Sequence, residues 1–311
     1  MTTQRKNINN EQFFTNFDTA QRLADWLKAQ QWFGSITKVV EPSAGDGAWL
    51  KAMKVDEAYD IDPQHPDVKL QDFLSEDFAV KNNGKVLYVG NPPFGRMGKL
   101  AKQFIDKCSE TGDYIAFILP ASFAKITQIR QMPEQFHLIY QEDLLDETFR
   151  FEREGKVVST IFQVWEKRKQ KRIDPERTNS HPDFSFVSNG EVTYSQVASQ
   201  IISLGVDKGL KNKIEELLSK NLSQRPAEVP QGVDLAICTH GSGAGKIFSS
   251  NFESKSTRTH RFIKVGAGID AKTLAKRLAT LDYKSIFKYT VGATCVSTEE
   301  IVMLYTQKYG K

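Results

Sequence analysis

The first half of the chain alternates short apolar, β-branched runs with segments whose apolar residues recur at helical spacing. Residues 19–29 predict a helix with one apolar face and Asp18 as its N-cap, and residues 99–108 predict another. The strand-like runs cover residues 36–42, 58–61, 85–90, 114–120, 136–140 and 157–165. Strands that alternate with helices predict an α/β fold with a mostly parallel sheet and helices on both faces. Because no helical pattern separates the last two runs, we expect them to form an antiparallel pair at the sheet edge.

The pattern changes after residue 166. Residues 166–180 contain fourteen polar residues or prolines around a single Ile, which indicates a linker or exposed connection. We therefore expect a first domain over 1–166, a linker over 167–182 and a smaller α+β domain over 183–311. The second domain is predicted to contain helices at 195–220 and 271–281, a proline-containing loop at 224–232, and strands at 234–239, 260–265 and 301–305.

Composition narrows the class of protein. Of 311 residues, 40% are hydrophobic and 26% are charged, which is typical of a globular protein. The longest apolar run, 114–120, is well short of the roughly 20 residues of a membrane helix. Residues 1–11 are polar and contain no apolar signal segment, so we expect a cytoplasmic protein. Cys108, Cys238 and Cys295 are widely spaced, which predicts neither a metal site nor a disulfide framework.

Charge is distributed unevenly along the chain. Residues 1–165 contain 19 of the 42 Lys and Arg residues but 23 of the 38 Asp and Glu residues. The first half is therefore acidic and the second half basic. This asymmetry favours an acidic domain for a cationic small molecule joined to a basic domain for a polyanion, although two domains can also differ in surface composition without any ligand.

The tetrapeptide Asn91-Pro92-Pro93-Phe94 directly follows the run 85–90. Ligands of open α/β sheets bind at the carboxyl ends of strands, so this is a position where a site is expected. The prolines make the backbone rigid and donate no N–H, so the Asn91 side-chain oxygen and the Pro92 carbonyl can accept hydrogen bonds from one NH2 group. Two such acceptors would localise the lone pair of the weakly nucleophilic amine of adenine or cytosine, and Phe94 would stack on the base. A proline-stiffened loop with one exposed aromatic residue is the simpler alternative.

A second pattern lies upstream. Residues 39–47 (VVEPSAGDG) predict a strand that runs into a glycine turn, where Gly45 and Gly47 allow a ligand close to the backbone. Asp60 ends the next strand-like run, where a carboxylate can bind ribose hydroxyls. Asp72 and Phe73 follow, with an acceptor for an adenine amine and a flat apolar wall.

These motifs, in this order, resemble those of S-adenosylmethionine-dependent N6-adenine DNA methyltransferases of the γ class, in which cofactor motifs precede the catalytic motif and the target-recognition region comes last. The resemblance covers roughly residues 12–166 and is weaker over 233–305. Besides the motifs above, residues 13–16 (FFTN) resemble the family's aromatic–aromatic–Thr–Pro motif, and 118–123 (ILPASF) resemble the strand after the catalytic motif. Asn16 departs from the family, which usually has proline there.

The resemblance implies a Rossmann-like methyltransferase fold with S-adenosylmethionine as cofactor and no metal. It implies that the target adenine is flipped out of a DNA duplex and methylated by one in-line displacement, without a covalent intermediate. Its catalytic residues would be Asn91, Pro92, Pro93 and Phe94. Its cofactor-binding residues would be Phe14, Thr15, Glu41, Ala44 and Gly45 around the methionine portion, Asp60 at the ribose, Asp72 and Phe73 at the adenine, and Asn91.

The basic second domain is expected to hold the DNA. Residues 240–245 (HGSGAG) predict a flexible loop that leads into a basic segment. We expect contacts to phosphates and base edges from Lys246, Lys255, Arg258, Arg261 and Lys264, and from Arg96 and Lys99 after the catalytic motif. An exposed basic loop without a ligand is the alternative.

Three other functions stay open. An RNA adenine methyltransferase would use the same tetrapeptide, and so would a protein glutamine N5-methyltransferase, although the latter usually has a helical domain before the cofactor motif. The third is a nucleic-acid-binding module without catalysis. The length leaves no room for an endonuclease domain, so we expect a methylation-only polypeptide whose restriction endonuclease, if one exists, is a separate chain.

Overall fold

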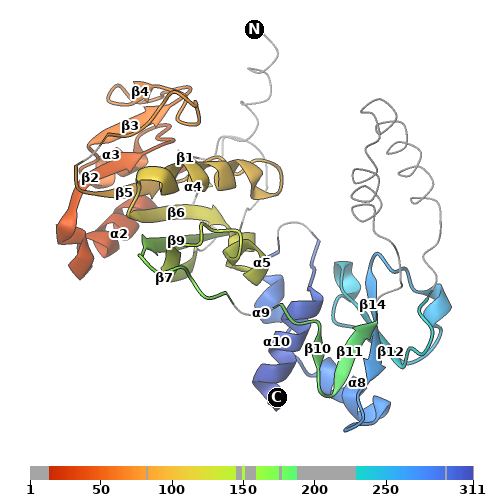
Figure 1. The fold of residues 1–311 in the computed structure, drawn as a ribbon. Coiled ribbons are helices and arrows are strands. Elements are labelled where there is room, and N and C mark those ends of the chain that lie inside the picture. The colour runs from red at the N-terminus through yellow and green to blue at the C-terminus, as the bar shows by residue number, and fades with distance from the viewer. Residues whose placement is uncertain are drawn as a thin grey trace, which may run out of the picture. The chain divides into compact units, whose positions relative to one another are not determined.

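The computed structural model describes residues 14–81, 83–144, 149–150, 159–174, 177–187, 229–290 and 293–310, with backbone alone for 149–150. They divide into two compact units (Figure 1). The first contains the described residues up to 174 together with 288–290, and the second contains 177–187, 229–287 and 293–310. The predicted helix at 195–220 lies outside the described residues, as do Phe13 and residues 224–228 of the predicted loop.

The first unit is built on a seven-stranded sheet with the order β4-β3-β2-β5-β6-β9-β7. Strands β4, β3, β2, β5 and β6 pair in parallel, whereas β9 runs antiparallel to both of its neighbours. The expected α/β fold is confirmed, with a mostly parallel, Rossmann-like sheet and an antiparallel pair at one edge. The strands are β2 (Ile36–Glu41), β3 (Glu57–Asp60), β4 (Lys69–Leu70), β5 (Lys85–Gly90), β6 (Tyr114–Pro120), β7 (Phe136–Leu144) and β9 (Thr160–Lys167).

Helices cover both faces of this sheet. On one face Trp49 of α3 stacks on Phe162 of β9, with ring centroids 6.3 Å apart. On the other face the hydroxyls of Tyr88 in β5 and Thr111 in α4 are 2.6 Å apart. The strand register places Tyr88 and Phe162 on opposite faces. The helices are α2 (Phe17–Lys28), α3 (Ala48–Ala52), α4 (Lys99–Thr111) and α5 (Ile126–Ile129), with short 3-10 turns η1 (Gln31–Ser35), η2 (Arg96–Gly98) and η3 (Ala121–Ala124).

The start of α2 differs from the prediction. Asn16 and not Asp18 is the N-cap, because the Asn16 side chain accepts a hydrogen bond from the Asp18 N–H at 3.0 Å. Asn16 has a φ of −64°, which is the angle that a proline ring imposes. The residue that departs from the family motif therefore keeps a proline-like backbone and also caps the helix. It directly follows β1 (Phe14–Thr15), which pairs with β8 (Phe149–Arg150).

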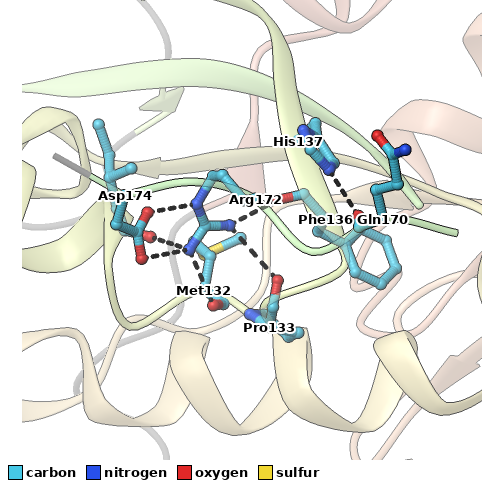
Figure 2. A network of polar contacts seen from close by, with 8 residues as sticks. Met132, Pro133, Phe136, His137, Gln170, Arg172 and Asp174 are labelled. Atoms are coloured by element: carbon cyan, nitrogen blue, oxygen red, sulfur yellow. Dashed lines mark hydrogen bonds and ion pairs between the residues drawn. The ribbon is translucent and has the colours of Figure 1, made fainter. Parts of the chain in front are cut away.

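The charged segment after β9 contains a partly buried arginine, Arg172, whose polar contacts are shown in Figure 2. The Arg172 side chain is 10% exposed and forms an ion pair with Asp174 at 2.6 Å. Its guanidinium also donates to the carbonyls of Ile129, Met132 and Phe136, at 3.0, 3.3 and 2.5 Å. It thereby satisfies backbone carbonyls at and beyond the end of α5. Within the run predicted as a solvated linker, Arg172 is instead an internal contact of the first unit.

In the described residues of the second unit, a five-stranded antiparallel sheet packs against helices. Its strand order is β10-β11-β14-β12-β13, and its core joins Leu235 and Ile263 of the sheet to Leu278 and Tyr305 of the helices. The strands are β10 (Ser180–His181), β11 (Phe184–Val187), β12 (Leu235–Cys238), β13 (Ile247–Phe248) and β14 (His260–Val265). The helices are α8 (Ala271–Ala279), α9 (Lys284–Phe287) and α10 (Thr298–Tyr309), with 3-10 turns η4 (Gly241–Gly243) and η5 (Phe252–Ser254).

Two predictions for this unit were wrong. Residues 301–305 belong to helix α10 and not to a strand, because Ser297 and Glu300 form a capping box that starts a helix there. Residues 240–245 are a hydrogen-bonded turn and not a flexible loop: the Gly245 N–H donates to the Cys238 carbonyl at 2.8 Å, and the Lys246 N–H donates to the Gly243 carbonyl at 3.0 Å. The predicted strands 234–239 and 260–265 and the helix 271–281 are confirmed by β12, β14 and α8.

Candidate active site

A cavity of about 380 Å³ lies at the carboxyl ends of β2, β3 and β5. Strands β3 and β5 flank β2 on its two sides, so the sheet order reverses here, and such a switch point is where open α/β sheets bind ligands. The structure brings all the predicted cofactor and catalytic residues to this one cavity. Its lining includes Phe14, Thr15, Glu41, Ala44, Gly45, Asp60, Asp72, Phe73, Asn91, Pro92, Pro93 and Phe94.

The glycine turn after β2 is tied to the end of β3. Gly45 has a φ of 49°, which favours glycine, and a Cβ there would be crowded at 3.0 Å from Cε1 of Phe14. Its N–H donates to Oδ2 of Asp60 at 2.8 Å, while the Asp62 N–H donates to Oδ1 of Asp60 at 2.8 Å. The Asp60 carboxylate is therefore held in place by backbone on both sides. Each of its oxygens still has capacity for a further hydrogen bond.

Glu41 is the buried charge of the cavity. Its side chain is in the interior, with the residue 2% exposed, and Oε2 has no hydrogen-bond partner among the described residues. Burial, followed by the nearby charges of Asp46 and Asp60, raises the pKa of Glu41 well above its usual range. A buried carboxylate in this state is stabilised as an anion only if a cation or a donor enters the cavity.

Asp72 and Phe73, the predicted adenine-binding pair, form part of the cavity wall. The Asp72 Oδ1 accepts a hydrogen bond from the Leu74 N–H at 2.9 Å, which fixes the turn. Phe73 is 2% exposed and stacks in parallel with Phe104 of α4, with ring centroids 6.0 Å apart. A flat apolar surface beside a carboxylate is suited to a planar heterocycle with an amino group.

Both ends of the tetrapeptide at residues 91–94 lie against other elements of the first unit. Before it, a Cβ at Gly90 would lie 3.6 Å from Cγ of Glu41, so the ends of β5 and β2 are adjacent. After it, the Phe94 carbonyl accepts hydrogen bonds from the N–H groups of Leu100 and Ala101, at 3.1 and 3.3 Å, at the start of α4. Phe94 is 8% exposed, so its ring belongs to the cavity wall and is not an exposed aromatic.

The predicted nucleic-acid-binding residues fall into separate groups. Arg96, the first residue of η2, and Lys99, the first residue of α4, are exposed in the first unit shortly after Phe94. In the second unit the register of β14 places Arg261 and Lys264 on opposite faces of the sheet. Arg261 donates to the carbonyls of Thr257 and His260, at 2.6 and 2.9 Å, and so supports the turn before β14. Arg258 is exposed in that turn.

Lys246 and Lys255 both lie close to an aromatic residue, Phe248, that sequence reasoning missed. Their Nζ atoms lie 5.8 and 4.1 Å from the ring centroid of Phe248. The ring of His260 contacts Phe248 edge-on at 5.4 Å, and burial lowers the His260 pKa. The position of Phe248 two residues after Lys246 was a visible signal, because cations beside aromatic rings are common in nucleic-acid-binding surfaces.

The cavity also has lining residues that the motifs did not indicate, among them Ile61, Gln71 and Leu100. Within the described ranges, no three His, Cys, Asp or Glu side chains form a group that could hold a metal ion. Of the helices in the described part of the chain, none has both the length and the apolar character needed to cross a bilayer.

Comparison with solved structures finds proteins described as methyltransferases. The 23S rRNA methyltransferase ErmE is similar with a TM-score of 0.38 and 18% identity, over 53% of this chain and 73% of that one. A candidate RNA methyltransferase from Pyrococcus horikoshii has a TM-score of 0.37 and 18% identity, over 50% of this chain and 87% of that one. A candidate class I S-adenosylmethionine-dependent methyltransferase from Listeria monocytogenes has a TM-score of 0.36 and 13% identity, over 51% and 61%. No family model matches the chain, and no curated protein matches it significantly.

Proposed function

We propose that this protein transfers a methyl group from S-adenosylmethionine to the exocyclic N6 amine of adenine in DNA, and that it acts in the cytoplasm. One observation carries the proposal. The tetrapeptide 91–94 and the carboxyl groups of Glu41, Asp60 and Asp72 line a single cavity at the switch point of the sheet.

The cavity residues fit the proposed cofactor. Oε2 of Glu41 is buried without a hydrogen-bond partner among the described residues, and a positively charged methionine portion would supply the missing charge. Asp60 retains acceptor capacity for ribose hydroxyls, and Asp72 with Phe73 would hold the adenine. When bound, S-adenosylmethionine supplies an electrophilic methyl group on a sulfonium.

The chain itself would position and activate the target amine. Asn91 and the Pro92 carbonyl would accept the two amine hydrogens, which localises the nitrogen lone pair, and Phe94 would stack on the base. Fixed acceptors that need no reorganisation favour a developing positive charge on the amine nitrogen. Base flipping costs a few kcal/mol, which stacking on Phe94 and phosphate contacts would offset.

The test of this function is methyl transfer from labelled S-adenosylmethionine to duplex DNA, single-stranded DNA, RNA and protein in parallel, followed by nucleoside analysis. We expect N6-methyladenine in DNA. Label in RNA or in glutamine alone would contradict the DNA assignment, and label in none of them would contradict methyl transfer.

Asn91 provides the first prediction. Asn91→Ala should reduce turnover on DNA by at least about 100-fold, because one of the two amine acceptors is lost. S-adenosylmethionine binding measured by calorimetry should weaken far less, because the other predicted cofactor-binding residues of the cavity remain. Asn91→Asp is the matched control, since it keeps an acceptor oxygen and should retain measurable turnover. Near-normal turnover of the alanine variant would remove Asn91 from the catalytic role.

A further inference from the structure

The loop between Phe94 and Leu100 presents an apolar side chain to solvent in an unfavourable backbone conformation. Met97 is 88% exposed and has a φ of 57°. Apart from glycine, Asn and Asp, residues adopt this conformation rarely, and such outliers concentrate at functional sites. Met97 is not buried, so packing does not explain a methionine at this position. Its positive φ is also unfavourable for a methionine.

The residues around Met97 form a tight turn. Gly95 and Gly98 on either side have φ values of 65° and 75°. A Cβ at Gly95 would lie 2.7 Å from Cβ of Leu100, and a Cβ at Gly98 would lie 2.7 Å from Cε2 of Phe123. The Gly98 N–H also donates to the Gly95 carbonyl at 3.2 Å. The loop is therefore a tight, fixed turn that holds Met97 outward.

This turn forms part of the rim of the cavity. Phe94 and Leu100, the residues at its two ends, both line the cavity. The exposed cationic side chains of Arg96 and Lys99 stand on either side of Met97 in sequence. Met97 is thus an exposed apolar side chain between two cations, beside the cavity. Apolar side chains of this kind enter base stacks in nucleic-acid-binding proteins, while neighbouring cations contact phosphates.

We propose that Met97 is a wedge that inserts into the DNA duplex and occupies the space left by the flipped adenine, with Arg96 and Lys99 at the flanking phosphates. The inference rests on the proposed function and adds a positioning residue to it. A base that leaves a stacked duplex opens an apolar gap, and an unbranched thioether side chain is flexible enough to fill it. The fixed turn would hold the methionine in position before DNA arrives.

The test compares paired and unpaired target bases. Wild-type protein is first used to methylate unmethylated genomic DNA, and the modified sites are mapped. Two synthetic duplexes are then made with the mapped sequence, one with the target adenine opposite thymine and one with it opposite an abasic position. Met97→Gly removes the wedge but suits the positive φ, so it should fold at least as well as wild type. Ile173→Gly is the matched control, because Ile173 is also apolar and 95% exposed in the first unit.

We expect Met97→Gly to lose at least about tenfold in kcat/KM on the paired duplex and less than about threefold on the abasic duplex, because an unpaired base is easier to flip. Met97→Leu should restore most of the loss, and Ile173→Gly should match wild type on both duplexes. Equal losses of Met97→Gly on the two duplexes, or no loss on either, would overturn the wedge while methyl transfer stands. Wild-type methylation of single strands alone would also overturn it, whereas absence of methylation on any nucleic acid would overturn the proposed function itself.

Discussion

The protonation state of Glu41 should change when a cation enters the cavity. Without a cation in the cavity, the folded protein keeps the Glu41 proton at pH values where the unfolded chain, with the ordinary pKa of 4.5, has lost it. The pKa of the folded state is raised, so the stability from this group is fully present below pH 4.5 and is lost as pH rises toward the folded-state pKa. A bound cation would reverse the balance by favouring the carboxylate.

Two measurements check the behaviour of Glu41. As the pH rises above 4.5, the free energy of unfolding of the wild type should fall relative to that of Glu41→Gln in urea titrations without cofactor. In calorimetry, S-adenosylmethionine binding should release a proton, so the wild-type binding enthalpy should depend on the ionisation enthalpy of the buffer. The Gln variant should show no such dependence. Parallel stability profiles for the two proteins would contradict a raised pKa.

Asp60 has a predicted role in cofactor binding that affinity measurements can test. Asp60→Ala should weaken S-adenosylmethionine binding by at least about tenfold, because each lost charge-assisted hydrogen bond contributes roughly 1.5–3 kcal/mol. The glycine turn would lose an anchor as well, since Gly45 donates to this carboxylate. Asp62→Ala removes an exposed neighbouring carboxylate and should leave the affinity unchanged. Equal affinities of the Asp60 variant and wild type would place the ribose elsewhere.

At the scale of elements, the position of the cavity was predictable and the Arg172 contacts were not. Parallel strands bring their carboxyl ends to one edge, so motifs that follow β2, β3 and β5 had to lie close together. Arg172 contacts carbonyls about forty residues earlier in the chain. No periodicity marks such a contact, and a run of charged residues is usually solvated. The helix that contains residues 301–305 could have been predicted, because Ser297 and Glu300 have the spacing of a capping box. The apolar run at 301–305 favoured a strand instead.

Arg172 is expected to stabilise the first unit strongly. Arg172→Ala should lower its free energy of unfolding by about 2 kcal/mol, because Asp174 and several carbonyls lose a partly buried charged donor. The control is Lys171→Ala, the adjacent cation, whose side chain is 73% exposed and pairs with the exposed Glu134. That variant should cost at most about 1 kcal/mol. Urea denaturation checks both, and similar costs for the two variants would show that Arg172 is not a structural anchor.

At the scale of the molecule, the basic half of the chain predicts salt-sensitive DNA binding. Each phosphate contact that is lost should flatten the dependence of log affinity on log salt concentration by about 0.9. The double variant Lys255→Gln with Arg258→Gln should therefore bind DNA more weakly and with a shallower slope, while its S-adenosylmethionine affinity stays the same.

A matched pair of substitutions separates position from net charge. Lys272→Gln with Lys276→Gln removes the same charge from exposed positions of α8 and should leave the slope nearly unchanged. The measurement is a salt titration of DNA binding for the three proteins. Identical slopes would mean that Lys255 and Arg258 are merely solvated, and the DNA surface would then be sought around Arg96 and Lys99.

Residues 288–290 belong to the first unit although they follow the second unit's helix α9 in the chain. This arrangement affects how such a protein can evolve by recombination between genes. Lys288 pairs with Asp143 at 2.6 Å, and Tyr289 packs against the first hydrophobic core. A gene segment that ends near residue 175 would therefore encode the first unit without residues 288–290. Recombination at a single crossover near residue 175 would combine the first unit with residues 288–290 from another protein. Inheritance of a new second unit would succeed most readily when its donor also supplies a lysine and a tyrosine at these two positions.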